Sequence, residues 1–138
     1  MGTQQLLFIV LGVIVVGIAI VVGLQMFEVN AVETNREAIV NQAVALALMA
    51  QEWYRKPAVL GGGSRSFATF DLRKIGYDGT GVGDSVEMES GKIWITDRQT
   101  GQMVIHVQGK ERGTDGNLLE LHVNVYPDSV GDPIWDHE

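Results

Sequence analysis

LLFIVLGVIVVGIAIVVGL, residues 6–24 of the chain, is a run of nineteen residues without a charged side chain. As a helix rising about 1.5 Å per residue, it would span about 29 Å, which is enough to cross the hydrocarbon layer of a membrane. No Lys or Arg precedes the run, and it is longer than the apolar region of a secretory signal peptide. The stretch therefore predicts a helix that can lie in a bilayer.

The residues that follow this run carry a second pattern. No Pro or Gly occurs from Gln25 to Lys56, and apolar residues recur there near helical spacing. The apolar positions that we expect to pack against the rest of the chain are Ile39, Ala43, Leu46, Ala50 and Trp53. Pro57 cannot continue a helix. We therefore predict one helix from about Thr3 to Lys56, apolar on all sides in its first half and on one side in its second.

The periodicity changes after this helix. PAVLGGGSRS, residues 57–66, predicts a flexible linker, and FATFDLRKIG, residues 67–76, predicts a short helical turn closed by Gly76. Apolar residues then alternate, which indicates an antiparallel meander. The four expected strands are residues 86–89, 92–96, 103–108 and 118–126. The predicted fold class is α+β, with a long N-terminal helix packed on a four-stranded antiparallel sheet.

One register of these strands gathers the apolar residues on a single face. It pairs Met88 with Ile93, Ile93 with Ile105, and Ile105 with Leu121. The face then contains Val86, Met88, Ile93, Ile95, Met103, Ile105, Val107, Leu119, Leu121, Val123 and Val125. A slip of one residue would turn the whole set outward. We expect this face to pack on the amphipathic half of the helix.

The charge and composition of the chain limit the kinds of partner and metal ligand that it can have. The 138-residue chain has a formal net charge of -7, and every charged residue lies after position 27. An acidic polar part repels phosphate backbones, whose binding depends on clustered Lys and Arg, so we expect no nucleic acid partner. The lack of cysteine excludes disulfides and thiolate metal ligands. The chain thus divides into an apolar half-helix (1–27), an amphipathic half-helix (28–56) and a small β head domain with a C-terminal tail (57–138).

MGTQQLLFIVLGVIVVGIAIVVGLQMF, residues 1–27, followed by an amphipathic half-helix, a Gly-rich connection and an antiparallel sheet, resembles the organisation of type IV pilins. The resemblance implies that Met1 is an N-terminus exposed by a prepilin peptidase. It also implies a chain that waits in the cytoplasmic membrane until a pilus assembly machinery adds it to a homopolymer at the cell surface. The residues that would form the membrane helix and then the filament core are Gln5, Leu6, Phe8, Leu11, Gly12, Val15, Gly17, Ala19, Val22, Gly23 and Phe27.

Gln5 departs from the family pattern, which usually has a glutamate at the fifth position of the processed chain. An amide can hydrogen-bond a neighbour's terminal ammonium but cannot neutralise it, and archaeal and other divergent pilins also lack this glutamate. The alternative function is a membrane-anchored pseudopilin or binding module whose helix stays in lipid. A lasting anchor usually carries flanking Lys or Arg and interfacial Trp or Tyr. The flanking residues here are Gln4, Gln5 and Glu28.

The opposite face of the predicted sheet carries two of the three histidines. The expected cross-strand rows are Lys92, His106 and Glu120, and then Trp94, Val104 and His122. One interpretation is a metal site formed by the two histidines and Glu120. A solvated face with a His–Glu pair is favoured, because two histidines on adjacent strands match no established ligand spacing. We therefore expect no metal and no other cofactor, and keep His106 and His122 as the candidates if a metal binds.

Other candidate sites have simpler explanations. Asp78 and Asp84 surround three glycines in a loop whose carboxylates suit calcium, but the EF-hand pattern is missing and a plain turn is preferred. No serine lies in a nucleophile motif such as G-x-S-x-G, so we expect no enzyme. A metal-dependent surface enzyme is a further hypothesis, and it would need both candidate histidines and a cavity.

In the tail, Ile134 and Trp135 are expected to pack on their own domain or on a neighbouring subunit.

Overall fold

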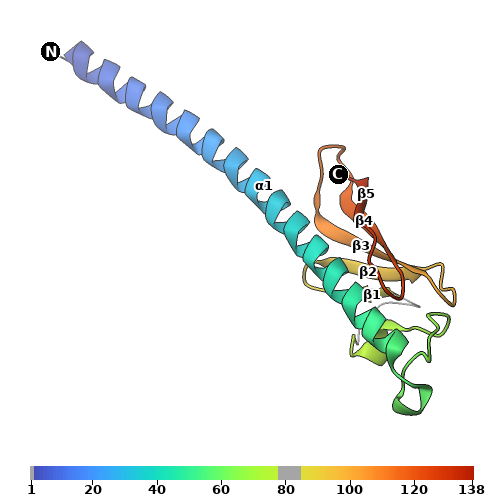
Figure 1. Cartoon of the computed structure of the whole chain (residues 1–138). Coiled ribbons are helices and arrows are strands. Elements are labelled where there is room, and N and C mark those ends of the chain that lie inside the picture. The colour runs from blue at the N-terminus through green and yellow to red at the C-terminus, as the bar shows by residue number, and fades with distance from the viewer. Residues whose placement is uncertain (1, 78–84) are drawn as a thin grey trace. The chain divides into compact units, whose positions relative to one another are not determined.

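Figure 1 shows the computed structural model of the chain, which describes residues 2–77 and 85–138. Contacts within the chain divide it into two compact units with a boundary between Glu33 and Thr34. Three residues named above, Met1, Asp78 and Asp84, lie outside the described residues.

The described residues form one long helix, two short 3-10 helices and five strands. The helices are α1 (Gly2–Arg55), η1 (Ala58–Leu60) and η2 (Leu72–Ile75). The strands are β1 (Ser85–Glu87), β2 (Gly91–Thr96), β3 (Met103–Arg112), β4 (Leu118–Val125) and β5 (Ile134–His137). They form one antiparallel sheet in the order β1-β2-β3-β4-β5. The predicted α+β class is confirmed, with five strands in place of four, because the C-terminal tail pairs with β4.

The core of the second unit lies between the inner face of the sheet and one side of α1 (Figure 1). Buried on the sheet are Val86, Ile93, Ile95, Met103, Ile105, Val107, Leu119, Leu121, Val123 and Val125. Buried on α1 are Ile39, Ala43, Leu46, Ala47, Ala50 and Trp53. Three of these helix residues are alanines, and short side chains let a helix approach a sheet closely. Phe67 and Phe70, which precede η2, close the end of this core, and Phe70 meets the Trp53 ring edge-on at 5.1 Å.

The strand pairing differs from the predicted register by two residues, although the predicted face is the buried one. Ile93 lies opposite Val107 rather than Ile105, and the pairing of β3 with β4 is shifted in the same way. A shift of two returns every side chain to the same face, so apolar alternation cannot detect it. The turns set the register instead. Between β1 and β2, Met88 and Gly91 exchange backbone hydrogen bonds of 2.7 and 3.3 Å around a two-residue turn. Met88, predicted to lie on the inner face, is therefore a half-buried turn residue.

Residues 57–66, predicted as a flexible linker, instead form an ordered cap on the end of α1. The backbone N–H groups of Gly63 and Ser64 donate to the carbonyl oxygens of Trp53 and Lys56, at 2.9 and 3.1 Å. These carbonyls belong to the last turn, where a helix leaves them without partners. A Cβ at Gly63 would lie 2.3 Å from the Trp53 ring. The prediction of a flexible linker was wrong, because this segment is hydrogen-bonded to the end of α1. A glycine is needed at position 63 so that the backbone can pass close to the Trp53 ring.

Asn35 connects α1 to the β1–β2 turn and to an irregular part of β3 through both ends of its amide. Its Oδ1 accepts hydrogen bonds from the backbone N–H groups of Lys110 and Glu111, at 3.1 and 3.3 Å, and its Nδ2 donates to the Ser90 carbonyl at 2.9 Å. The two N–H donors lie where β3 departs from regular pairing with β4, so the sheet leaves them without a ladder partner. A Cβ at Gly109 would lie 2.2 Å from Asn35 Oδ1, which explains a glycine at this position.

Replacing Asn35 by alanine is expected to destabilise the second unit by about 1 kcal/mol, because the exposed N–H of Lys110 and the partly buried N–H of Glu111 lose their acceptor. Asn35→Asp keeps the acceptor and should cost less. Urea unfolding of the detergent-solubilised chain, followed by tryptophan fluorescence, measures the difference. Asn41→Ala is the matched control, since Asn41 lies exposed on the same helix. Equal stability of the Asn35→Ala and Asn41→Ala chains would contradict this role.

Candidate functional site

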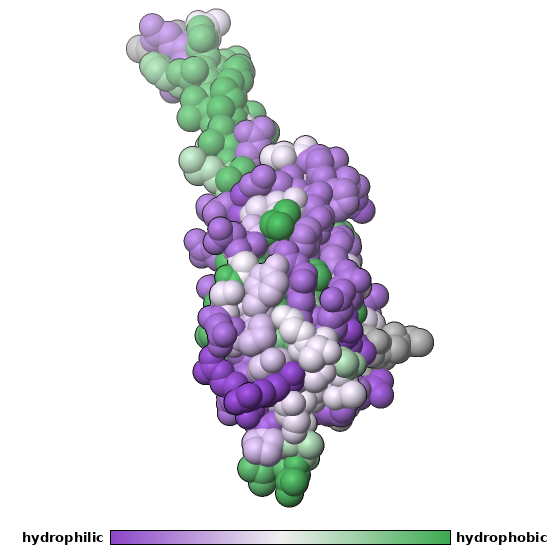
Figure 2. Space-filling view, turned by 45° about the vertical axis from the view of Figure 1, so that its right-hand side comes forward, coloured by the Kyte–Doolittle hydropathy of each residue, from purple (hydrophilic) through white to green (hydrophobic). Residues whose placement is uncertain are grey.

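The first unit, residues 1–33, contains the apolar part of α1, and its described residues are exposed apart from the half-buried Gly23 and Val32. Of the predicted filament-core residues, Gly23 is half-buried and the other ten are exposed. Exposed fractions of 73% at Phe8 and 77% at Phe27 show how little of this surface is covered. Figure 2 shows it as a continuous green region. By length and composition, α1 can span a membrane, and none of its most apolar 18-residue window is buried.

Water is a poor environment for this surface. The fifteen Leu, Ile, Val and Phe residues between positions 6 and 24 each favour membrane insertion by about 0.3–0.6 kcal/mol, or about 5–9 kcal/mol together. Three glycines interrupt the apolar side chains, and a Cβ at Gly12, Gly17 or Gly23 would meet nothing within 4 Å. Small residues of this kind allow another helix to approach closely. The surface can therefore be covered by lipid or by other helices.

The outer face of the sheet carries a row of aromatic rings on β2, β3 and β4. The shifted register places Trp94 opposite His106 and His106 opposite His122. Trp94 stacks on His106 with a ring separation of 5.2 Å and an interplanar angle of 7°, and the two imidazoles lie 5.4 Å apart. The hydroxyl of Thr96 forms a hydrogen bond of 3.0 Å with His106 Nε2. The sequence-based prediction placed His106 and His122 in different cross-strand rows. Those rows are wrong, because the strand pairing is shifted by two residues from the predicted register.

The carboxylate beside the histidines comes from β5 and not from Glu120. Nδ1 of His122 donates to Asp136 Oδ2 at 2.7 Å, because a carboxylate can only accept. One ligand atom of each of His106, His122 and Asp136 lies within 4.8 Å of the other two. Glu120 instead accepts a hydrogen bond of 3.2 Å from Gln108. Sequence reasoning missed Asp136, because only the pairing of the tail with β4 brings it to this row.

Burial lowers the pKa of His106 below its ordinary value of 6.5, and the neighbouring His122 acts in the same direction. The carboxylates of Asp136, Glu120 and Asp97 oppose this shift but do not cancel it. The Nδ1 atom of His106 is also buried and has no hydrogen-bond partner among the described residues. His106 is thus a neutral imidazole at neutral pH, with one ring nitrogen unpaired.

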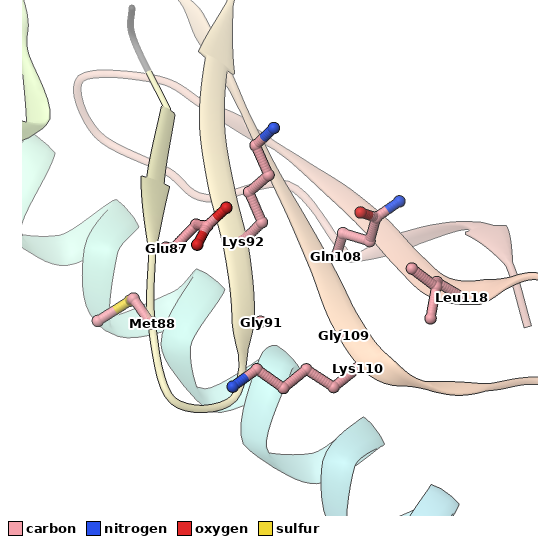
Figure 3. A pocket seen from close by; sticks show the side chains of 8 residues that line it. All are labelled: Glu87, Met88, Gly91, Lys92, Gln108, Gly109, Lys110 and Leu118. Carbon is pink, nitrogen blue, oxygen red and sulfur yellow. The ribbon is translucent and has the colours of Figure 1, made fainter. Parts of the chain in front are cut away.

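A hollow of about 360 Å³ lies beside the β1–β2 turn, and Figure 3 shows the residues that line it. Its charged lining residues are Glu87, Lys92 and Lys110, and the backbone of Gly91 and Gly109 forms part of the wall. Among the described residues, no histidine or hydroxyl side chain lines it. One carboxylate beside two ammonium groups does not form a pair of nucleophile and general base. The mixed charges also do not favour a ligand of one charge sign, so this hollow offers no evident catalytic arrangement.

The tail packs on its own unit as strand β5, which is one of the two arrangements expected for it. Leu121 on β4 lies opposite Trp135, and the Arg36 guanidinium lies 5.1 Å from the Trp135 ring centroid. Nη1 of Arg36 also donates to Glu138 Oε1 at 2.9 Å. Ile134 remains 48% exposed. The contacts of Arg36 therefore connect α1 to the end of the chain.

Comparison of the chain with protein-family models, with curated proteins and with solved structures gives no significant match.

The lowered pKa of His106 predicts a loss of stability on mild acidification. Below pH 6.5 the unfolded chain binds a proton at this imidazole more readily than the folded chain does. The contribution of His106 to the free energy of unfolding is therefore fully present above this pH and is lost as the pH falls below it. In the presence of a chelator, unfolding free energies measured between pH 7.5 and 5 should fall less steeply for His106→Asn than for the parent chain. His137→Asn, whose ring lies beside Asp115, should keep the parent slope. Identical slopes for all three chains would show that His106 is not responsible.

Proposed function

We propose that this chain is the structural subunit of a type IV pilus-like filament at the cell surface, which polymerises through the N-terminal part of α1. The observation that carries the proposal is the uncharged apolar surface from Gly2 to Phe27, exposed on every side of one continuous helix. A filament core made of such helices would bury this surface against copies of itself. The N-terminal organisation resembles that of type IV pilins, which supports the same assignment.

The residues around the apolar run favour a filament over a permanent anchor. No Lys, Arg, Trp or Tyr lies among residues 1–27, so the helix lacks the usual interfacial groups that hold a segment at a fixed depth in lipid. Its three glycines leave space for neighbouring helices. The chain would wait in the cytoplasmic membrane after cleavage by a prepilin peptidase, and an assembly machinery would then move it into the polymer.

The second unit would form the outer part of the filament. It carries a formal charge of -5 out of the total of -7, because only Glu28 and Glu33 among the charged residues belong to the first unit. Burial of its apolar sheet face within the unit leaves a surface that is mostly purple and white in Figure 2, although Val59 and Leu60 remain exposed. The side-chain amide of Gln5 would form a hydrogen bond with the N-terminal amine of a neighbouring subunit. A glutamate at this position would form an ion pair instead. No cofactor or catalytic residue is required for this role.

A second candidate function is that of a membrane-anchored pseudopilin or binding module. The observation in its favour is the length of the apolar run, nineteen residues, which fits the bilayer without any need for a polymer. In this case α1 would remain in lipid, and the second unit would bind a partner.

Val15→Asp separates the two candidates. One Asp at a helix centre opposes insertion by about 2.5–3.5 kcal/mol, which is less than the 5–9 kcal/mol that favours insertion of the run as a whole, so the variant should still enter the membrane. In a filament core the same carboxylate would be buried among helices without a counter-charge. Filaments in the sheared fraction, counted by electron microscopy and quantified by mass spectrometry, should disappear while the chain stays in membranes.

Two controls accompany this variant. Val15→Leu keeps an apolar side chain and should assemble normally. Val59→Asp makes the same chemical change at a site in the second unit that is 96% exposed, and it should also assemble. Normal numbers of filaments from Val15→Asp would refute a core in which this position is buried.

A further inference from the structure

We propose that His106, His122 and Asp136 bind a Zn²⁺ ion on the outer face of the sheet. The three side chains come from β3, β4 and β5, and one ligand atom of each lies within 4.8 Å of the other two. Ligand atoms around a tetrahedral zinc ion lie about 3.3 Å apart when the bonds are about 2.0–2.1 Å long. The cluster therefore needs to contract by about 1.5 Å at most, and the exposed Asp136 side chain is free enough to rotate.

The donor set fits zinc better than calcium or magnesium. Two imidazole nitrogens and one carboxylate oxygen suit zinc, copper and nickel, whereas calcium and magnesium select oxygen ligands. An imidazole binds metal through a nitrogen that carries no proton, and the buried Nδ1 of His106 has no hydrogen-bond partner among the described residues. With three protein ligands, the fourth position would be taken by water.

Neighbouring groups hold the histidines in place before a metal arrives. The stacked Trp94 ring and the hydrogen bond from Nε2 to Thr96 fix the orientation of His106, which leaves its buried Nδ1 as the unpaired nitrogen. His122 is held by Asp136 through a 2.7 Å hydrogen bond. For Nδ1 of His122 to bind Zn²⁺, its proton would move to Nε2 of the same ring. The hydrogen bond of His106 through its other ring nitrogen is of the kind that orients histidine ligands in metal sites.

A metal at this position would fasten β5 to the sheet. β5 is a four-residue edge strand, and its pairing with β4 is irregular between Glu120 and Leu121. Asp136 lies beside Trp135, whose ring contacts Arg36 of α1. The ion would therefore be structural, and it would stabilise the contact between the C-terminal strand and α1. This role does not depend on whether the chain polymerises.

Zinc binding is tested on the full chain without a purification tag, in detergent and after treatment with a chelator. Titration with Zn²⁺ against a competing fluorescent chelator should give one ion per chain, and Ca²⁺ should not compete. His122→Ala should abolish this binding, and Asp136→Asn should weaken it about 10-fold or more. His137→Ala is the matched control, because it removes the histidine outside the cluster, and it should bind like the parent chain.

Hydrogen exchange gives a second readout. Zn²⁺ should slow exchange of the β5 amides in the parent chain and in His137→Ala, but not in His122→Ala. Tryptophan fluorescence checks that each variant is folded, and Asp136→Asn changes an exposed side chain, so it tests the site even if a histidine variant unfolds. The absence of saturable Zn²⁺ binding by the parent chain would overturn the proposal. So would equal Zn²⁺ affinity in the parent, His122→Ala and Asp136→Asn chains.

Discussion

The nineteen uncharged residues of α1 from Leu6 to Leu24 expose apolar side chains that must be covered by something other than water. Lipid and a bundle of identical helices both satisfy this requirement. A pilus-like subunit would be covered first by lipid in the membrane and then by neighbouring helices in the filament. The apolar and amphipathic parts belong to one helix without an internal proline. The chain needs no active site to perform such a role.

The second unit is built around the other part of the same helix. Alanines at positions 43, 47 and 50 lie buried between larger residues of α1 and the inner face of the sheet. Polar contacts then fix the helix at several points: Asn35 at the β1–β2 turn and the β3 bulge, Gln51 at the carbonyl of Tyr126, and Arg36 at the chain end. These contacts secure the unit without disulfides, which the cysteine-free sequence cannot form.

The sequence predicted those features that depend on periodicity. The extent of α1, its buried side and the inner face of the sheet all follow from spacings of 3.6 and 2 residues. The register could not be predicted, because a shift of two residues preserves the face and the turns decide between the alternatives, as the Met88–Gly91 turn does for β1 and β2. The glycines of residues 61–63 have a composition typical of linkers, yet they allow the chain to approach the end of α1. Asp136 was missed because β5 brings it beside His122 from a tail that was expected to pack on its own domain or on a neighbouring subunit, not to pair with β4 as a strand.

Electron microscopy of material sheared from producing cells, with the protein identified in that fraction by mass spectrometry, tests the central proposal most directly. The filament hypothesis predicts thin, uniform fibres composed of this chain, with residues 6–24 inaccessible to protease. Recovery of the well-expressed chain only from detergent-extracted membranes, with no fibres in the sheared fraction, would contradict it. The helix would then be an anchor, and the second unit would be the binding part of the protein.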